Sequence, residues 1–253
     1  MGRVVLVSGG GTGIGRAVAR RFAHGGDRVV LVGRRADVLK RTATELEEAT
    51  GAEIARLSAD LSETDGARQV RDAVAERFGR IDVLVNSAGG NAALNPPDEE
   101  EDPLGRTAGH WLGNFRANVL TAVLLTEAVR DLLAAPGGRV VLLSSIAAYR
   151  GSGTGSYGAS KAALHPYVFD LAAALGPRGI TVNAVAPGYV EDTEFFGGAL
   201  SEQRRSSLIA QTANGRAGTP RDVADTVHWL ADPASGHVTA QIVQVNGGAE
   251  KGR

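Results

Sequence analysis

Short apolar runs alternate with longer amphipathic stretches along almost the whole 253-residue chain. The apolar runs have the length of strands, and several are continuously apolar, which is typical of strands covered on both faces. The stretches between them have the length and polarity pattern of helices. Regular alternation of this kind predicts an α/β, doubly wound fold: a parallel sheet with helices on both faces.

Seven runs are predicted as strands, and six stretches as helices. The strands are Val4–Val7, Arg28–Val32, Glu53–Leu57, Ile81–Val85, Arg139–Leu143, Thr181–Ala186 and Gln241–Val245. The helices lie near Gly13–His24, Ala36–Ala49, Thr64–Phe78, Leu112–Leu133, Gly155–Leu175 and Pro220–Leu230. The sequence contains no internal repeat and no linker between two cores, so we expect a single domain over residues 1–253.

The segment Asn91–Gly109 interrupts this rhythm. It contains an acidic run bracketed by prolines, Pro96–Pro103, and both prolines and like charges disfavour regular structure. The simplest interpretation is a solvated surface loop. A loop that shapes substrate access is the alternative, because it follows the fourth strand and ligands of such sheets bind beyond the carboxyl ends of the strands.

Composition excludes several classes of function. A formal net charge of −1 gives no basic surface for nucleic acid or an anionic membrane. The absence of cysteine excludes disulfides, thiolate catalysis and cysteine-ligated metals, and we predict no metal site. No segment reads as a signal peptide or a membrane span, so a cytoplasmic protein is expected.

A glycine-rich turn follows the first predicted strand directly and opens the first helix. It reads Ser8-Gly9-Gly10-Gly11-Thr12-Gly13-Ile14-Gly15. Glycines allow a sharp turn and a close approach of the backbone to a pyrophosphate, which then faces the helix N-terminus. This position favours dinucleotide binding over a plain tight turn. A phosphate-binding loop of the nucleotide-hydrolase type is excluded, because Arg16 stands where that motif continues with Gly-Lys.

Two arginines, Arg34 and Arg35, follow the second strand. A carboxylate at this place would bind the adenosine ribose of NAD, whereas arginine pairs with the 2′-phosphate of NADP. The pair therefore favours NADP(H), with NAD(H) still possible and a merely solvated arginine pair as the alternative.

Tyr157 and Lys161 are four residues apart in a predicted helix and so share a face. A phenol with a pKa near 10 is a poor proton donor and acceptor at neutral pH, and a nearby cation lowers that pKa. Only three of the 27 basic residues are lysine, so a lysine at this place favours a functional role for the pair. The strand Val140–Leu143 precedes this helix and ends in Ser144 and Ser145, whose hydroxyls are well placed to bind a substrate oxygen.

Together with further motifs, these segments make the chain resemble the short-chain dehydrogenase/reductase family over essentially its whole length. Within that family, the chain resembles the 3-oxoacyl-(acyl-carrier-protein) reductase-like ketoreductases. The glycine-rich turn resembles TGxxxGIG with Ser8 for Thr, and Tyr157 and Lys161 match YxxxK. The other matching segments are Asp60-Leu61, Asn86-Ser87-Ala88-Gly89, Asn118, Pro187-Gly188, Val238–Gln241 and Asn246–Gly248.

The resemblance implies a Rossmann-type domain whose seven-stranded sheet has the order 3-2-1-4-5-6-7. It implies an NADP(H)-dependent oxidoreductase acting on a carbonyl or secondary alcohol. Tyr157 would be the general acid/base, Lys161 would hold the nicotinamide ribose and depress the pKa of Tyr157, Ser145 would orient the reacting oxygen, and Asn118 would support a proton relay. The implied cofactor residues also include the following: Ser8, Gly9, Gly11, Thr12, Gly13, Ile14, Gly15, Arg34, Arg35, Asp60, Leu61, Asn86, Ala88, Gly89, Tyr157, Lys161, Pro187, Gly188, Val190 and Thr193.

Several departures from the family pattern bear on these roles. The family serine usually lies 13 residues before the tyrosine, which is Ser144 here; we prefer Ser145, because aligning the strand ends then places a one-residue deletion in the loop 151–155. Pro166 should kink the helix that carries Tyr157 and leave the Ala162 carbonyl without its usual donor. That helix often forms subunit contacts in the family, so a homo-oligomer, tetramer or dimer, is expected.

Residues 190–214 are expected to form a substrate lid. The aromatic residues Tyr189, directly before it, and Phe195 and Phe196 within it either line the site or belong to ordinary packing. At the mouth of the site, the acidic run 96–103 would repel an acidic acyl carrier protein, and in that position it favours a small-molecule substrate.

Other functions are less compatible with the sequence. A serine hydrolase is disfavoured because the chain has no G-x-S-x-G motif, and a zinc hydrolase because it has no HExxH motif. The remaining rival is a family member that binds NADP(H) as a regulatory or scaffolding protein without turnover. Retention of Asn118, Ser145, Tyr157 and Lys161 argues against it.

Overall fold

Seven parallel strands form one sheet in the computed structural model, which describes residues 2–94, 102–196 and 200–251. The strands are β1 (Val4–Ser8), β2 (Arg28–Gly33), β3 (Ile54–Ser58), β4 (Val83–Asn86), β5 (Arg139–Leu143), β6 (Thr181–Pro187) and β7 (Ile242–Val245). Their order across the sheet is β3-β2-β1-β4-β5-β6-β7, as predicted. The predicted strand bounds agree with the observed ones to within two residues.

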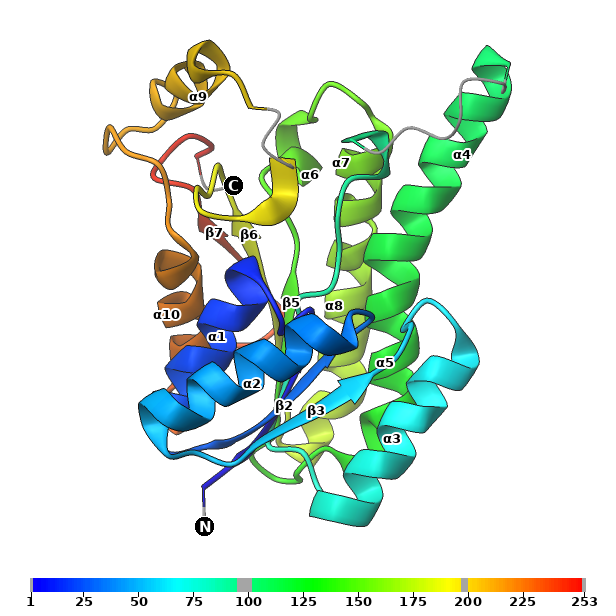
Figure 1. Ribbon diagram of the computed structural model, residues 1–253, viewed down its shortest axis with the longest axis vertical. Helices are drawn as coiled ribbons and strands as arrows, with labels where there is room; N and C mark the ends of the chain where they lie inside the picture. The colour runs from blue at the N-terminus through cyan, green and yellow to red at the C-terminus, as the bar shows by residue number, and fades with distance from the viewer. Residues whose placement is uncertain (1, 95–101, 197–199, 252–253) are drawn as a thin grey trace.

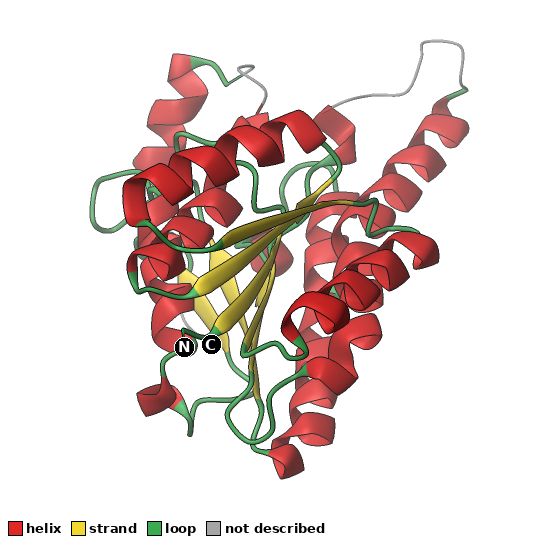
Figure 2. Ribbon diagram, turned by 60° about the horizontal axis from the view of Figure 1, so that its bottom comes forward, coloured by secondary structure: helices red, strands yellow, loops and turns green. Residues whose placement is uncertain are grey.

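Helices cover both faces of the sheet (Figures 1 and 2). The helices are α1 (Gly13–His24), α2 (Ala36–Thr50), α3 (Thr64–Phe78), α4 (Pro103–Phe115), α5 (Thr121–Val129), α6 (Ala147–Arg150), α7 (Ser156–Ala162), α8 (Leu164–Leu175), α9 (Glu202–Ile209) and α10 (Pro220–Leu230). One face packs against α3, α5 and α8, and the other against α1, α2 and α10. No helix of the described ranges is both long and apolar enough to cross a membrane.

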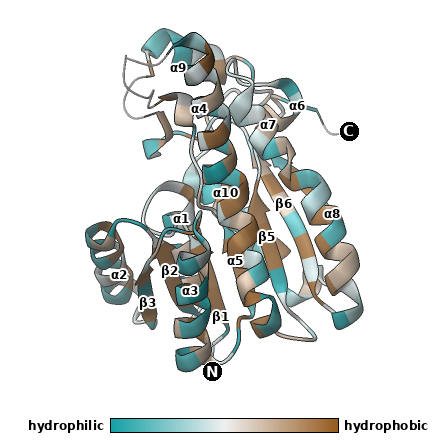
Figure 3. Cartoon of the chain, turned by 90° about the vertical axis from the view of Figure 1, so that its right-hand side faces the viewer, coloured by the Kyte–Doolittle hydropathy of each residue, from teal (hydrophilic) through white to brown (hydrophobic). Residues whose placement is uncertain are grey.

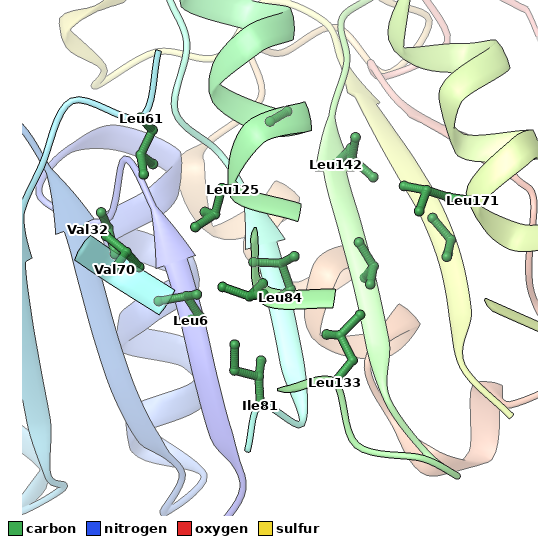
Figure 4. Close-up of a cluster of buried hydrophobic side chains, with 14 of the residues drawn as sticks. Leu6, Val32, Leu61, Val70, Ile81, Leu84, Leu125, Leu133, Leu142 and Leu171 are labelled. Atoms are coloured by element: carbon green, nitrogen blue, oxygen red, sulfur yellow. The ribbon is translucent and has the colours of Figure 1, made fainter. Parts of the chain in front are cut away.

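The alternation of side chains along the strands explains why both faces are covered. In β1, Val4 and Leu6 belong to one buried cluster, while Val5 and Val7 belong to the other. Successive residues of a strand point to opposite faces, so a continuously apolar strand must be buried on both sides. Figure 4 shows the first cluster, in which Leu6 lies close to Leu84 and Leu125, and Figure 3 shows the apolar strands behind helices whose outer faces are polar.

The expectation of irregular structure over residues 91–109 was wrong for its second half. Residues 95–101, and with them most of the acidic run 96–103, lie outside the described residues. α4 begins at Pro103, whose missing N–H and fixed φ suit the first position of a helix. The Asp102 carboxylate caps the helix by accepting from the backbone N–H groups of Leu104 and Gly105 at 2.8 and 3.1 Å. The proline and acid that suggested a loop are therefore the start signal of a helix.

The helix predicted near Leu112–Leu133 is interrupted. A π-helical turn, Arg116–Leu120, joins α4 to α5, and a 3₁₀ turn, Arg130–Leu132, follows α5. A π-helical turn of this kind often marks a functional site.

The helix predicted near Gly155–Leu175 is divided into α7 and α8 at Ala163. The break lies three residues before Pro166, where the sequence predicts a kink, because the proline ring and its missing N–H disturb the preceding turn.

Candidate active site

The loops that carry the predicted motifs gather at the carboxyl end of the sheet. In the register of the parallel strands, Ser8 at the end of β1 pairs with Asn86 at the end of β4, and Asn86 pairs with Leu142 near the end of β5. The glycine-rich turn, the Asn86–Gly89 segment and the two serines therefore leave the sheet side by side. This edge is where open α/β sheets bind their ligands.

The glycine-rich turn is closely packed against the loop after β4. The Ser8 hydroxyl accepts hydrogen bonds from the backbone N–H groups of Ser87 and Ala88 at 3.1 and 3.0 Å, which ties the two loops together. A Cβ atom on Gly15 would lie 2.2 Å from the Gly9 carbonyl oxygen, so only glycine fits at that position. Ser8 and Gly15 thus shape the turn.

A cavity of about 570 Å³ lies between these loops. Predicted cofactor residues that line it are Gly9, Gly11, Thr12, Arg34, Arg35, Asp60, Leu61, Ala88 and Gly89. Residues that the sequence analysis missed also line it, among them Val38, Ser62, Asn91, Arg116 and Thr121. No local motif marks these side chains, because they reach the cavity from helix ends and turns. Its volume, and its lining by the glycine-rich turn, the end of β2 and the loop after β4, suit a dinucleotide.

Charged groups surround the end of the cavity nearest β2. Arg34 and Arg35 both line it, and the Arg35 Nη2 atom lies 2.7 Å from Glu194 Oε2, with both side chains more than half exposed. The pKa of Asp60 is lowered, first by hydrogen bonds from the Ser62 hydroxyl and backbone N–H and then by the positive charges of Arg34 and Arg116. This end of the cavity offers two guanidinium groups to an anionic ligand.

Tyr157 is a buried phenol near the start of α7. Burial raises the pKa of Tyr157 to about 12, and a hydrogen bond with the Ser145 hydroxyl acts in the opposite direction. The ring of Phe195 lies against it, with 5.3 Å between the ring centroids. At neutral pH the phenol is protonated and is a proton donor.

Lys161 lies one helical turn further along α7, and its ammonium is fully buried. Burial lowers the pKa of Lys161 to about 8, and its Nζ atom donates to the Leu143 carbonyl at 2.8 Å. The same Nζ would lie 3.1 Å from a Cβ atom on Gly89, so the ammonium borders the cavity-lining loop. The expectation that Lys161 depresses the pKa of Tyr157 is not met in this structure, because desolvation of the phenol outweighs the other influences on it.

The two serines after β5 face different neighbours. The Ser145 hydroxyl contacts the Tyr157 phenol and accepts from the Ala147 N–H at 3.1 Å. The Ser144 hydroxyl instead donates to the Lys161 carbonyl at 3.2 Å and lies 2.8 Å from His165 Nε2. Ser145 is therefore the serine whose hydroxyl meets the phenol.

Asn118 lies in the π-helical turn and is buried. Its Nδ2 donates to the carbonyls of Gly90 and Asn114 and to the Ser160 hydroxyl at 2.8, 3.0 and 3.1 Å, and its Oδ1 accepts from the Gly90 N–H at 3.0 Å. Its amide thus connects the loop after β4 to α7. Oδ1 also faces Gly89, since a Cβ there would lie 2.6 Å away.

Other predicted cofactor residues lie around the cavity and do not line it. Asn86 is buried and donates from Nδ2 to the Thr126 hydroxyl at 2.8 Å, so it holds α5 to the sheet. Gly13 and Ile14 begin α1, and Pro187 ends β6. The Pro-Gly motif packs closely against the C-terminal Asn-Gly-Gly segment, because a Cβ on Gly188 would lie 2.8 Å from the Cβ of Asn246.

The predicted lid lies over the glycine-rich turn. The Thr193 side chain would lie 3.6 Å from a Cβ on Gly13, and Val190 and Thr193 line a smaller cavity of about 140 Å³. Phe195 lies 4.9 Å from Phe196, and Phe196 6.0 Å from Tyr189, between ring centroids. These aromatic rings form a row that begins at Tyr157. Residues 197–199 of the predicted lid lie outside the described residues.

A doubly wound sheet with a dinucleotide-sized cavity beside a buried Tyr-Lys pair defines a nicotinamide-dependent oxidoreductase. A family model described as enoyl-(acyl carrier protein) reductase matches residues 9–250. The short-chain reductase protein NovJ of Streptomyces niveus is 35% identical over 258 aligned residues, covering 97% of this chain and 93% of the relative. The 3-oxoacyl-[acyl-carrier-protein] reductase FabG of Escherichia coli is 31% identical over 252, covering 98% and 97%.

A solved structure shows the same likeness. A short-chain dehydrogenase of Burkholderia cenocepacia, in complex with NADP, superposes with a TM-score of 0.85 at 32% identity, covering 98% of this chain and 97% of that one. The chain belongs to the short-chain dehydrogenase/reductase family, and it is an oxidoreductase of that type.

Proposed function

We propose that this protein is an NADP(H)-dependent carbonyl reductase in which Tyr157 is the general acid/base. The observation that carries the proposal is the meeting of the Tyr157 phenol and the Ser145 hydroxyl, with the Lys161 ammonium bordering the loop that lines the cofactor-sized cavity. A bound NADPH would supply the hydride. The complexes of relatives with NADP support this choice of cofactor.

Each residue has a separate task in the proposed reaction. The hydroxyls of Ser145 and Tyr157 bind the substrate carbonyl oxygen, and Tyr157 gives its proton to that oxygen as negative charge develops there. Lys161, a cation below its pKa of about 8, holds the ribose next to the nicotinamide. The Asn118 amide keeps the loop after β4 and α7 at a fixed distance.

The direct test is NADPH oxidation by the purified protein with a panel of aldehydes and ketones. We expect turnover with at least one carbonyl substrate, and NADPH binding whether or not substrate is present. A protein that binds NADPH and turns over no carbonyl would instead support the regulatory or scaffolding role.

The two serines give a prediction that separates their roles. Ser145→Ala should lower kcat about 100-fold or more, because it removes a hydroxyl that binds the reacting oxygen. Ser144→Ala should stay within about 10-fold of the wild type, because that hydroxyl is engaged with the Lys161 carbonyl and His165. Steady-state kinetics on both variants decides the matter, and the reverse order of effects would refute the assignment of Ser145.

Arg34 and Arg35 are expected to recognise the 2′-phosphate. Replacing both with Ala should raise the Kd for NADPH about 10- to 50-fold and change the Kd for NADH less than about 3-fold. Only NADPH has a 2′-phosphate that would lose charge-assisted hydrogen bonds, and solvent weakens these bonds at exposed arginines. Fluorescence titration with each cofactor measures this. Arg41→Ala, on the exposed side of α2, is the matched control. Equal loss of NADPH and NADH affinity would contradict a role in phosphate recognition.

The buried pair predicts different pH dependences for the two reaction directions. Reduction needs the protonated phenol, which a pKa of about 12 preserves, and the Lys161 cation, which is lost as the pH rises through about 8. The kcat/KM for carbonyl reduction should therefore be level below about pH 8 and fall above it. Alcohol oxidation needs the phenolate together with the same Lys161 cation, so its kcat/KM should rise up to about pH 8 and then level off. Initial rates in both directions across this range test the signs. Reduction that accelerates with pH would be incompatible with Tyr157 as the acid.

We also propose that the protein forms a homo-oligomer. Leu104 and Leu112 on α4 are 80% and 71% exposed, and Phe115 on the same helix is 42% exposed. Large apolar side chains clustered on one helix are typical of association surfaces, and α4 projects beyond the carboxyl end of the sheet (Figure 1).

A further inference from the structure

Asn114 is a fully buried amide on α4 that the reaction described above does not use. It lies four residues before Asn118, is 0% exposed, and belongs to none of the motifs read from the sequence. Its Nδ2 donates to the Ser156 hydroxyl at 2.9 Å, and its Oδ1 accepts from the Ala92 N–H at 3.0 Å. A buried amide engaged on both sides in this way fixes the relative position of the groups it binds.

Asn114 and Asn118 make the same pattern of contacts one helical turn apart. Asn114 binds Ser156 on α7 and Ala92 after β4, and Asn118 binds Ser160 on α7 and Gly90 after β4. We call these two amides and two serines the Asn-Ser ladder: Asn114, Asn118, Ser156 and Ser160. All four side chains are buried. The ladder therefore joins the loop that borders the cofactor cavity to the helix that carries the phenol and the ammonium.

The ladder holds α7 directly on either side of Tyr157. Ser156 is the residue before Tyr157, and the Ser160 hydroxyl, which accepts from Asn118, donates to the Tyr157 carbonyl at 2.7 Å. Lys161 follows Ser160. Each serine of the ladder thus directly precedes one of the two reactive residues in the sequence.

α7 needs such support because its own helical structure is minimal. It runs only from Ser156 to Ala162, and the break at Ala163 separates it from α8. Its N-cap is Gly155, which has no side chain with which to cap the free N–H groups. A helix of two turns has little stability of its own, so contacts from other elements set its position.

We propose that Asn114 is a positioning residue for hydride and proton transfer, which it supports by fixing the first turn of α7 against the loop after β4. This inference rests on the proposed carbonyl reductase activity. Asn114 forms no hydrogen bond with Tyr157 and does not itself line the cavity. Besides a 3.5 Å contact of its Nδ2 with Oδ1 of the cavity-lining Asn91, it acts through Ser156 and Ala92. Its removal should leave the charged groups at the adenosine end of the cavity, Arg34 and Asp60, in place.

The test compares Asn114→Leu with Asn183→Leu. Asn183 is a matched control: it is 1% exposed, donates to the Val238 carbonyl at 2.8 Å, accepts from the Gln241 N–H at 3.0 Å, and lies in β6 away from α7. Both variants should lower the Tm. At a temperature well below either Tm, Asn114→Leu should lower kcat about 30-fold with the KM for NADPH within about 3-fold. Asn183→Leu should keep kcat within about 2-fold.

Ser156→Ala provides a second, milder variant if Asn114→Leu does not fold. It removes the hydroxyl that accepts from Asn114 and should lower kcat about 5-fold. When Asn114→Leu and Ser156→Ala are combined, the loss of kcat should be smaller than the product of the two single losses. The inference is overturned if wild type turns over a carbonyl and kcat stays within 2-fold in folded Asn114→Leu, or in Ser156→Ala. A wild type that binds NADPH without turnover would overturn the proposed function, and this inference with it.

Discussion

Tyr157→Phe should lower the kcat for carbonyl reduction about 1000-fold and leave NADPH binding within about 5-fold of the wild type. The substitution removes the phenol proton that we propose is given to the substrate oxygen beside the Ser145 hydroxyl, and a positioned general acid contributes about 10²- to 10⁴-fold to a rate. The phenol is buried with a pKa raised to about 12, so it carries this proton throughout the neutral range. Stopped-flow NADPH oxidation and fluorescence titration measure the two quantities.

A matched control removes a hydroxyl outside the site. Tyr167 on α8 is partly buried and its hydroxyl donates to Glu127 at 3.0 Å, away from the site, so Tyr167→Phe should keep kcat within about 2-fold. A Tyr157→Phe variant that keeps more than about a tenth of the wild-type kcat would mean that another group supplies the proton.

Gly89→Ala should abolish most of the activity through a single methyl group. A Cβ at residue 89 would lie 2.6 Å from Asn118 Oδ1 and 3.1 Å from Lys161 Nζ, so the amide, the ammonium or the loop must move. Overpacking of this kind costs about 1–3 kcal/mol of stability, and displacement of the ammonium should lower kcat about 100-fold. Thermal unfolding and steady-state kinetics measure the two effects.

The neighbouring glycine provides the control for this substitution. A Cβ on Gly90 would meet nothing within 4 Å, so Gly90→Ala should keep both stability and kcat close to wild-type values. If the two variants behave alike, the contact of Gly89 with Asn118 and Lys161 is not what limits this position.

The sheet and most of the helices could be predicted from the sequence because burial on both faces leaves a direct pattern of apolar residues. β5 at Arg139–Leu143 and the helices α1, α3 and α10 have the predicted bounds. The start of α4 could not be predicted in the same way, because Asp102 and Pro103 occur equally in loops and at helix N-termini. Only the tertiary position of the segment selects between these structures.

The site was predictable where it consists of local motifs and not where it depends on contacts between distant segments. The glycine-rich turn, Tyr157 and Lys161 are readable because their spacing follows from one turn or one helix. The contacts of Asn114 with Ser156 and of Arg35 with Glu194 join residues 42 and 159 positions apart. The pKa of Tyr157 could not be derived from its spacing to Lys161 either, since burial of the phenol decides its direction.

The most direct test uses NADPH deuterated at C4 of the nicotinamide, with the label placed on one face of the ring or on the other. Transfer of the deuterium to the product reports whether hydride moves to a carbonyl carbon whose oxygen Tyr157 protonates. With the wild type, we predict an alcohol that carries deuterium on its carbinol carbon from one of the two faces, and with Tyr157→Phe almost no labelled alcohol in the same time. An alcohol without deuterium from either face, or equal labelling by Tyr157→Phe, would contradict the proposed reaction.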